Sequence, residues 1–90
     1  MSQELIYAAQ SGDLALVNGL LAAGADVNHA DSYGEYGNTA LIVAARYGHA
    51  EMVRLLLVAP GVAVNHANQY GNTALIHAAR GGHMGVVAAL

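Results

Sequence analysis

The sequence contains no cysteine, which excludes disulfide bonds and cysteine-based zinc sites. Its only basic side chains are Arg46, Arg54 and Arg80, and three arginines cannot form the basic stripe that a nucleic-acid-binding surface needs. No apolar run approaches the roughly 18 to 20 residues of a membrane span, and residues 1–4 lack the basic segment of a secretory signal. We therefore expect an intracellular, cytoplasmic protein that binds neither nucleic acid nor a membrane.

The residues that are present are mostly apolar, with glycines placed among them. The chain has 90 residues, enough for one domain, and 56% of them are hydrophobic while only 10% are charged. Phenylalanine and tryptophan are absent, so tyrosine supplies the large aromatic side chains. Eleven glycines in a chain of this length indicate frequent turns.

A block of thirteen residues occurs twice. Residues 37–49 read GNTALIVAARYGH and residues 71–83 read GNTALIHAARGGH, so eleven of the thirteen positions are identical at an offset of 34. A weaker copy, LIYAAQSGD at 5–13, lies 36 residues before 41–49, and the block VNHA at 27–30 returns at 64–67. The sequence is therefore built from internal repeats, which we expect to span residues 1–33, 34–69 and 70–90, the last one incomplete.

Each repeat has the pattern of two helices joined by turns. Thr39 and Thr73 are suited to cap the first helix, because a threonine hydroxyl accepts a hydrogen bond from a free backbone N–H, and Gly48 and Gly82 are suited to end it. The second helix has apolar residues at helical spacing. Because one such unit cannot bury its apolar face alone, we expect the units to stack. A plain bundle of four or five helices is the alternative, but it does not explain the copied turns.

These motifs resemble the ankyrin repeat, whose signature is T-P-L-H-x-A. The signature reads TALIVA at 39–44 and TALIHA at 73–78, Gly-His follows at 48–49 and 82–83, and the G-A-D-V-N ending is intact at 24–28. The resemblance implies an all-α fold, a solenoid of about two and a half helix–turn–helix repeats with short hairpin-like turns between units. It also implies a scaffold that binds another protein and has no catalytic residue, no metal site and no cofactor.

The sequence departs from the ankyrin pattern in its signature and in its turns. Ala40 and Ala74 replace proline, and Ile42 and Ile76 replace histidine, so the threonine–histidine hydrogen bond expected of the family is absent. One extra residue lies near Pro60, and three extra residues lie in the turn at 31–39, where Tyr-Gly occurs twice. We expect this longer turn to project further than its counterpart.

The last helix ends in an apolar run without a glycine or a polar cap. Met84, Val87 and Leu90 are therefore expected to form an exposed apolar face. Two explanations remain open. The chain is a structural fragment of a longer array that stacks on further repeats, or the face pairs with a second copy of the chain to form a homo-oligomer.

Histidine is the only candidate residue type for site chemistry in this sequence. His49 and His83 occupy the Gly-His position, for which the resemblance implies a structural hydrogen bond to the backbone. His29 and His66 lie one repeat apart, on the order of 10 Å, too far to share a zinc ion with ligands at about 2 Å. His77 aligns with a position that borders the groove of the family, where partner contact and simple packing are equally open. Carboxylates and serines show no catalytic pattern, so we expect no enzymatic activity.

The resemblance places partner binding at the turn tips and on the exposed face of the first helix of each unit. Tyrosine and arginine, which are enriched at binding hot spots, are concentrated there. The tyrosines have a second interpretation, in which they only brace the turns. The equivalent positions of Tyr36 and Tyr70 favour bracing for those two, whereas Tyr33 and Tyr47 are better candidates for recognition. The predicted partner-binding residues are Tyr33, Glu35, Tyr36, Asn38, Arg46, Tyr47, Gln69, Tyr70, Asn72, His77 and Arg80, with Gln10 and Ser11 beside them.

Overall fold

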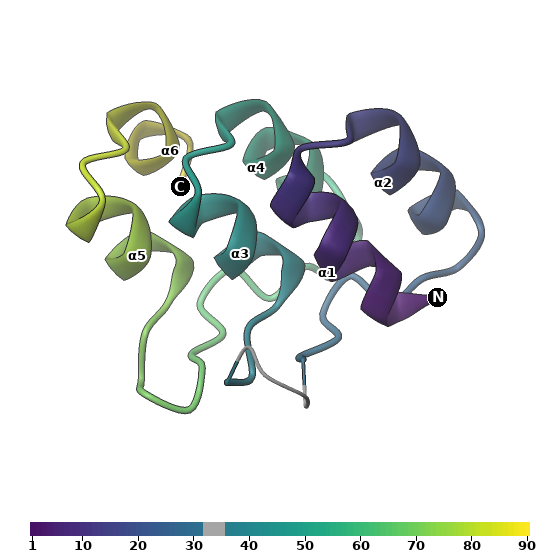
Figure 1. The fold of residues 1–90 in the computed structure, drawn as a ribbon, viewed down its shortest axis with the longest axis horizontal. Helices are drawn as coiled ribbons and strands as arrows, with labels where there is room; N and C mark the ends of the chain where they lie inside the picture. The colour runs from purple at the N-terminus through teal and green to yellow at the C-terminus, as the bar shows by residue number, and fades with distance from the viewer. Residues whose placement is uncertain (32–35) are drawn as a thin grey trace.

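The computed structural model describes residues 1–31 and 36–90, which form helix–turn–helix pairs stacked side by side (Figure 1). The first helices α1, α3 and α5 form one row, and the second helices α2, α4 and α6 form another. In the described residues there is no strand, and no helix there is long and apolar enough to cross a membrane. The predicted all-α architecture of stacked helix pairs is therefore confirmed. The helices are α1 (Ser2–Ser11), α2 (Leu14–Ala22), α3 (Ala40–Arg46), α4 (Ala50–Leu57), α5 (Ala74–Arg80) and α6 (Met84–Ala89).

The predicted ends of the first helices are confirmed. Thr39 Oγ1 accepts a hydrogen bond from the backbone N–H of Ile42 at 3.3 Å, and Thr73 Oγ1 accepts the equivalent bond at 3.3 Å. Gly48 follows α3 with φ of 74°, a left-handed conformation that a residue with a side chain rarely adopts. Gly82 follows α5 in the same way, with φ of 70°. The copied Thr and Gly positions thus set the length of α3 and α5.

The core lies between consecutive helix pairs as well as within each pair. Helix α3 packs against both α1 and α5, and every residue from Ala40 to Ala45 is buried. Ala8 and Ala9 on α1 and Ala78 on α5 are buried against it. Small alanine side chains let the first helices approach closely.

His49 and His83 each join their own helix pair to the preceding one. The Nε2 atom of His49 donates to the backbone carbonyl of Gln10, at the end of α1, at 2.8 Å. His83 donates in the same way to the carbonyl of Arg46, at the end of α3, at 3.0 Å. The structural role expected for these histidines is confirmed. Each one satisfies a carbonyl that the preceding helix leaves without an intrahelical partner.

The loops that follow the second helices also join successive units. The side chain of Asn28 accepts a hydrogen bond from the N–H of Ala63 at 2.7 Å and donates one to the carbonyl of Gly61 at 2.8 Å. His66 Nε2 donates to the carbonyl of Gly37 at 3.1 Å. These bonds link residues 29 to 35 positions apart, so only stacking of the units creates them.

The turns before α3 and α5 are closed by the same backbone pairing. The N–H of Asp31 donates to the carbonyl of Asn38, and the N–H of Asn68 donates to the carbonyl of Asn72, both at 2.9 Å. The first turn therefore spans three more residues than the second, as the sequence predicts. How far it projects depends on residues 32–35, which include Tyr33 and Glu35 and lie outside the described residues.

Candidate protein-binding surface

Tyr47, at the end of α3, is held in one position by neighbours from two helix pairs. Its hydroxyl oxygen accepts a hydrogen bond from Arg46 at 2.9 Å and a longer one from the side-chain amide of Gln10 at 3.5 Å. The guanidinium carbon of Arg46 lies 4.9 Å from the centre of the tyrosine ring. The ring also stacks beside that of His49, with centroids 6.3 Å apart. Tyr47 nevertheless remains 43% exposed, so it is both ordered and available for contact.

Arg80 occupies the place on α5 that Arg46 has on α3. Its Nη1 donates to Oδ1 of Asn72 at 3.0 Å, which ties the end of α5 to the turn that precedes the helix. Asn72 in turn donates its backbone N–H to Oδ1 of Asn68 at 3.0 Å, and Tyr70 donates to the same atom at 2.9 Å. The predicted residues Tyr70, Asn72 and Arg80 are thus brought together through Asn68.

His77 lies on α5 between the charges of two arginines. Its partial burial lowers the pKa of His77 below its ordinary value of 6.5, and the positive charges of Arg46 and Arg80 lower it further. The neutral ring can accept the hydrogen bond that Asn68 Nδ2 donates to its Nε2 at 3.4 Å. This surface therefore presents an uncharged imidazole at neutral pH.

Tyr36 and Tyr70 form an aromatic pair at the tips of successive turns. Their ring centroids are 5.1 Å apart and their planes are tilted by 58°. The N–H of Gln69 donates to the carbonyl of Tyr36 at 2.9 Å, so the two turns are also joined by their backbones. This geometry supports the bracing interpretation for both tyrosines. Both rings are more than half exposed, so bracing does not remove them from the surface.

Asn38 does not lie on the surface, contrary to its place among the predicted partner-binding residues. Its side chain is only 1% exposed, and its Oδ1 accepts a hydrogen bond from Nδ2 of Asn68 at 2.9 Å. The next unit covers Asn38, whereas the equivalent Asn72 is partly exposed. Asn38 is therefore a residue of the junction between two turns.

Two residues of this region were missed by the sequence reasoning. Tyr7 on α1 is more than half exposed, and its alignment with His77 was a signal that could have identified it. Asn68 organises the second turn and contacts both Asn38 and His77. No repeated motif marks Asn68, because the equivalent position in the preceding unit is Asp31.

We call the exposed side chains of the first-helix row the first-helix surface. It carries two of the three arginines of the chain. The turn-tip pair of Tyr36 and Tyr70, with Gln69 beside it, lies at the ends of the turns that lead into this row. The first-helix surface is defined by Tyr7, Gln10, Arg46, Tyr47, His77 and Arg80.

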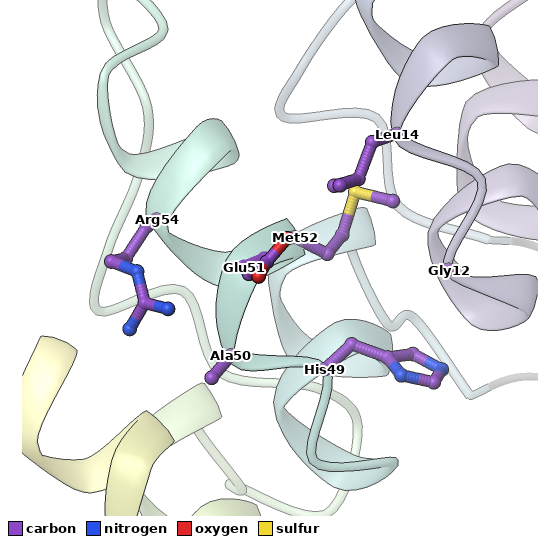
Figure 2. Close-up of a pocket in the computed structure, with 7 residues that line it drawn as sticks. All are labelled: Gly12, Leu14, His49, Ala50, Glu51, Met52 and Arg54. Carbon is purple, nitrogen blue, oxygen red and sulfur yellow. The ribbon is translucent and has the colours of Figure 1, made fainter.

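A surface hollow of about 360 Å³ lies between the starts of α2 and α4 (Figure 2). The ring of His49 points toward Gly12 on one side of it, and its Nε2 is already bonded to a backbone carbonyl. In the part of the chain that the structure describes, no group of three or more His, Asp or Glu side chains could hold a metal ion. Among the described residues, the hollow therefore offers no assembled metal site. Its lining residues are Gly12, Leu14, His49, Ala50, Glu51, Met52 and Arg54.

A family model of ankyrin repeats, in three copies, matches residues 5–90 of this chain. The chain belongs to the ankyrin repeat family, and its helix pairs are ankyrin repeats. A comparison with curated proteins finds no match. Ankyrin repeats are in general modules for protein–protein interaction, and members of the family are typically not enzymes.

Proposed function

We propose that this chain is a non-catalytic scaffold that binds a partner protein through its first-helix surface and its turn-tip pair. The observation that carries the proposal is the arrangement around Tyr47, a half-exposed aromatic ring fixed by Arg46 and Gln10. A side chain that is already ordered loses little conformational entropy when a partner covers it. Tyrosine and arginine are also the side chains that most often dominate binding energy.

The partner covers residues from three successive units in this proposal. Tyr7 and Gln10 come from the first unit, Tyr47 from the second and Arg80 from the third. Hydrogen bonds and ring contacts join these units, so their side chains are presented from one frame. Such a frame supplies shape and spacing, while the exposed side chains select the partner.

Capture of the partner from native cells, followed by measurement of its dissociation constant, tests the proposal. We expect Tyr47→Ala to weaken binding by about 30-fold, the equivalent of about 2 kcal/mol for a hot-spot residue. Tyr47→Phe keeps the ring but removes the hydroxyl that Arg46 and Gln10 bind, so it should weaken binding less.

Arginine substitutions provide the matched control. Arg80→Ala should weaken binding, whereas Arg54→Ala removes the same charge from an exposed position on α4 and should leave binding unchanged. Far-UV circular dichroism and the urea midpoint verify that each variant is folded. Equal binding by the wild type, Tyr47→Ala and Arg80→Ala would show that the partner does not use this surface.

A further inference from the structure

Helices α3 and α5 contain no acidic residue, and each ends at an arginine. The last residue of α3 is Arg46 and the last residue of α5 is Arg80. The two helices pack against each other, and His77 precedes Arg80 by three residues, so it lies on the same side of α5 one turn earlier. The α3–α5 pair therefore brings two guanidinium groups and an imidazole together on the first-helix surface.

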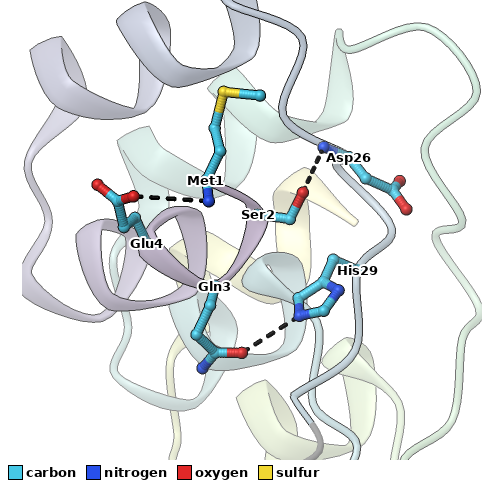
Figure 3. A network of polar contacts seen from close by, with 6 residues as sticks. All are labelled: Met1, Ser2, Gln3, Glu4, Asp26 and His29. Carbon is cyan, nitrogen blue, oxygen red and sulfur yellow. Dashed lines mark hydrogen bonds and ion pairs between the residues drawn. The ribbon is translucent and has the colours of Figure 1, made fainter.

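Most carboxylates of the described residues belong to other parts of the array. Glu4 lies at the start of α1, where it pairs with the N-terminal ammonium at 3.5 Å (Figure 3). Asp13 and Glu51 lie at the starts of α2 and α4, in the second-helix row, and Asp26 lies in the loop after α2. The formal net charge of the chain is −3, yet α3 and α5 contribute only positive charge.

Arg80 is oriented by a neutral side chain. Its Nη1 donates to Oδ1 of Asn72 at 3.0 Å, and it forms no ion pair with a carboxylate of the described residues. A guanidinium has five N–H donors, so this single hydrogen bond leaves donors for an anion. Arg80 is also exposed. It is therefore a cation held in place by the turn before α5, with capacity to bind a negatively charged group.

His77 responds to the charges around this position. Arg46 faces it from α3 and Arg80 from its own helix, and partial burial together with these two charges lowers the pKa of His77. The turn before α5 contributes the neutral side chain of Asn68, which donates to Nε2 at 3.4 Å. A negative charge placed beside His77 would offset the arginines. The other titratable side chains on the elements packed against α5 are Asp31, Tyr36, Tyr47, Tyr70 and His83.

The apolar residues Met84, Val87 and Leu90, predicted to form an exposed face, do not contribute to this surface. They lie in α6 or directly after it, in the second-helix row. Met84 is exposed, whereas Val87 and Leu90 are partly buried against the core. The first-helix surface itself offers tyrosine rings, arginines and amides, which favours a charged segment of a partner over a purely apolar one.

We propose that the first-helix surface binds an acidic segment of the partner protein, with one aspartate or glutamate side chain held by Arg80 beside His77. This inference rests on the proposed function, because it names the chemistry of the partner at that same surface. The planar fork of a guanidinium matches the two oxygens of a carboxylate. The carboxylates elsewhere on the chain repel an acidic segment, so charge directs it to this surface.

A displayed library of random linear peptides, sorted for binding to the intact chain at neutral pH, tests the proposal. We expect the enriched peptides to share an aspartate or glutamate at one position. Replacing that residue by asparagine or glutamine, which keeps its shape but removes its charge, should weaken binding by about tenfold. A sorted library without an acidic consensus would overturn the proposal.

A double-mutant cycle assigns the peptide carboxylate to Arg80. Arg80→Gln should weaken the unmodified peptide by about tenfold and the amide peptide much less, because the two changes remove the same interaction. Arg54→Gln removes the same charge from an exposed position on α4 and should leave both affinities unchanged. Far-UV circular dichroism verifies that the variants are folded. Additive effects of Arg80→Gln and the peptide substitution would overturn the assignment.

The pH dependence of binding tests the position of the carboxylate beside His77. Because the carboxylate offsets the charges of the two arginines, it should raise the pKa of His77 in the complex. Binding then takes up a proton, so the affinity should rise by about threefold from about pH 7.5 to about pH 6, a range in which the peptide carboxylate stays ionised. His77→Gln should abolish this rise. An affinity that is constant or falls on acidification would contradict the proposal.

Tyr47→Ala separates this inference from the proposed function. If the enriched peptides bind this variant as tightly as the wild type, they use another surface and both proposals fail. If Tyr47→Ala weakens binding but Arg80→Gln does not, the first-helix surface is the binding site and only the acidic segment is refuted.

Discussion

Replacing Asn28 by alanine tests how much one side chain contributes to the junction between two repeats. Asn28 follows α2, yet both of its side-chain hydrogen bonds reach the loop after α4, at Gly61 and Ala63. The equivalent residue Asn65 is exposed and makes no side-chain hydrogen bond to any described residue. The two asparagines therefore share their local sequence but differ in what the following unit supplies.

The expected loss of unfolding free energy follows from the two hydrogen bonds that the Asn28 side chain makes. Each contributes about 0.5–1.5 kcal/mol net, so Asn28→Ala should lower the free energy of unfolding by roughly 1–3 kcal/mol. With a denaturant slope of about 1–2 kcal/mol per molar urea, the midpoint should fall by roughly 0.5–3 M. Asn65→Ala should change the free energy of unfolding by less than about 0.5 kcal/mol, as is usual for an exposed side chain without a partner.

Urea unfolding followed by far-UV circular dichroism measures both variants under the same conditions. If the wild type and Asn28→Ala have similar denaturant slopes, their difference in midpoint reports a change in stability and not a change in the unfolded state. If Asn28→Ala and Asn65→Ala had the same midpoint, the inter-repeat hydrogen bonds would not contribute to stability and the reasoning would be refuted.

Three further predictions concern other levels of the fold. Gly48→Ala should destabilise the chain more than Gly82→Ala, and urea midpoints measure the difference. Both glycines have positive φ, so alanine is strained at either position. Only at Gly48 would the added Cβ also come within 2.6 Å of a histidine ring of the next unit. Leu41→Ala should cost about 2–5 kcal/mol and Leu75→Ala much less, since the first is buried and the second half exposed; equal losses would contradict the burial. The free energy of unfolding should fall as the pH drops below about 6.5. Because the pKa of His77 is lowered in the folded chain, the unfolded chain takes up a proton more readily than the folded one. His77→Gln should therefore flatten this part of the pH profile.

The candidate surface was predicted in part. Arg46, Tyr47 and Arg80 were identified from their position at the end of the first helix, and the structure places all of them at that end. The contact of Gln10 with Tyr47 joins residues 37 positions apart, and neither residue type signals the other. Asn38 was assigned to the surface because the resemblance places partner binding at the turn tips, but the neighbouring turn buries it.

The sequence by itself determined the elements and their order of stacking. Threonine caps and left-handed glycines act within a few residues of their own positions, so a copied motif produces a copied local structure. Only the tertiary structure decided which side chains are covered. Leu41 and Leu75 lie in the same Thr-Ala-Leu-Ile sequence, yet one is buried and the other half exposed. This difference in exposure arises because the third unit packs over Leu41. A pattern read within a single repeat contains no information about the neighbouring unit.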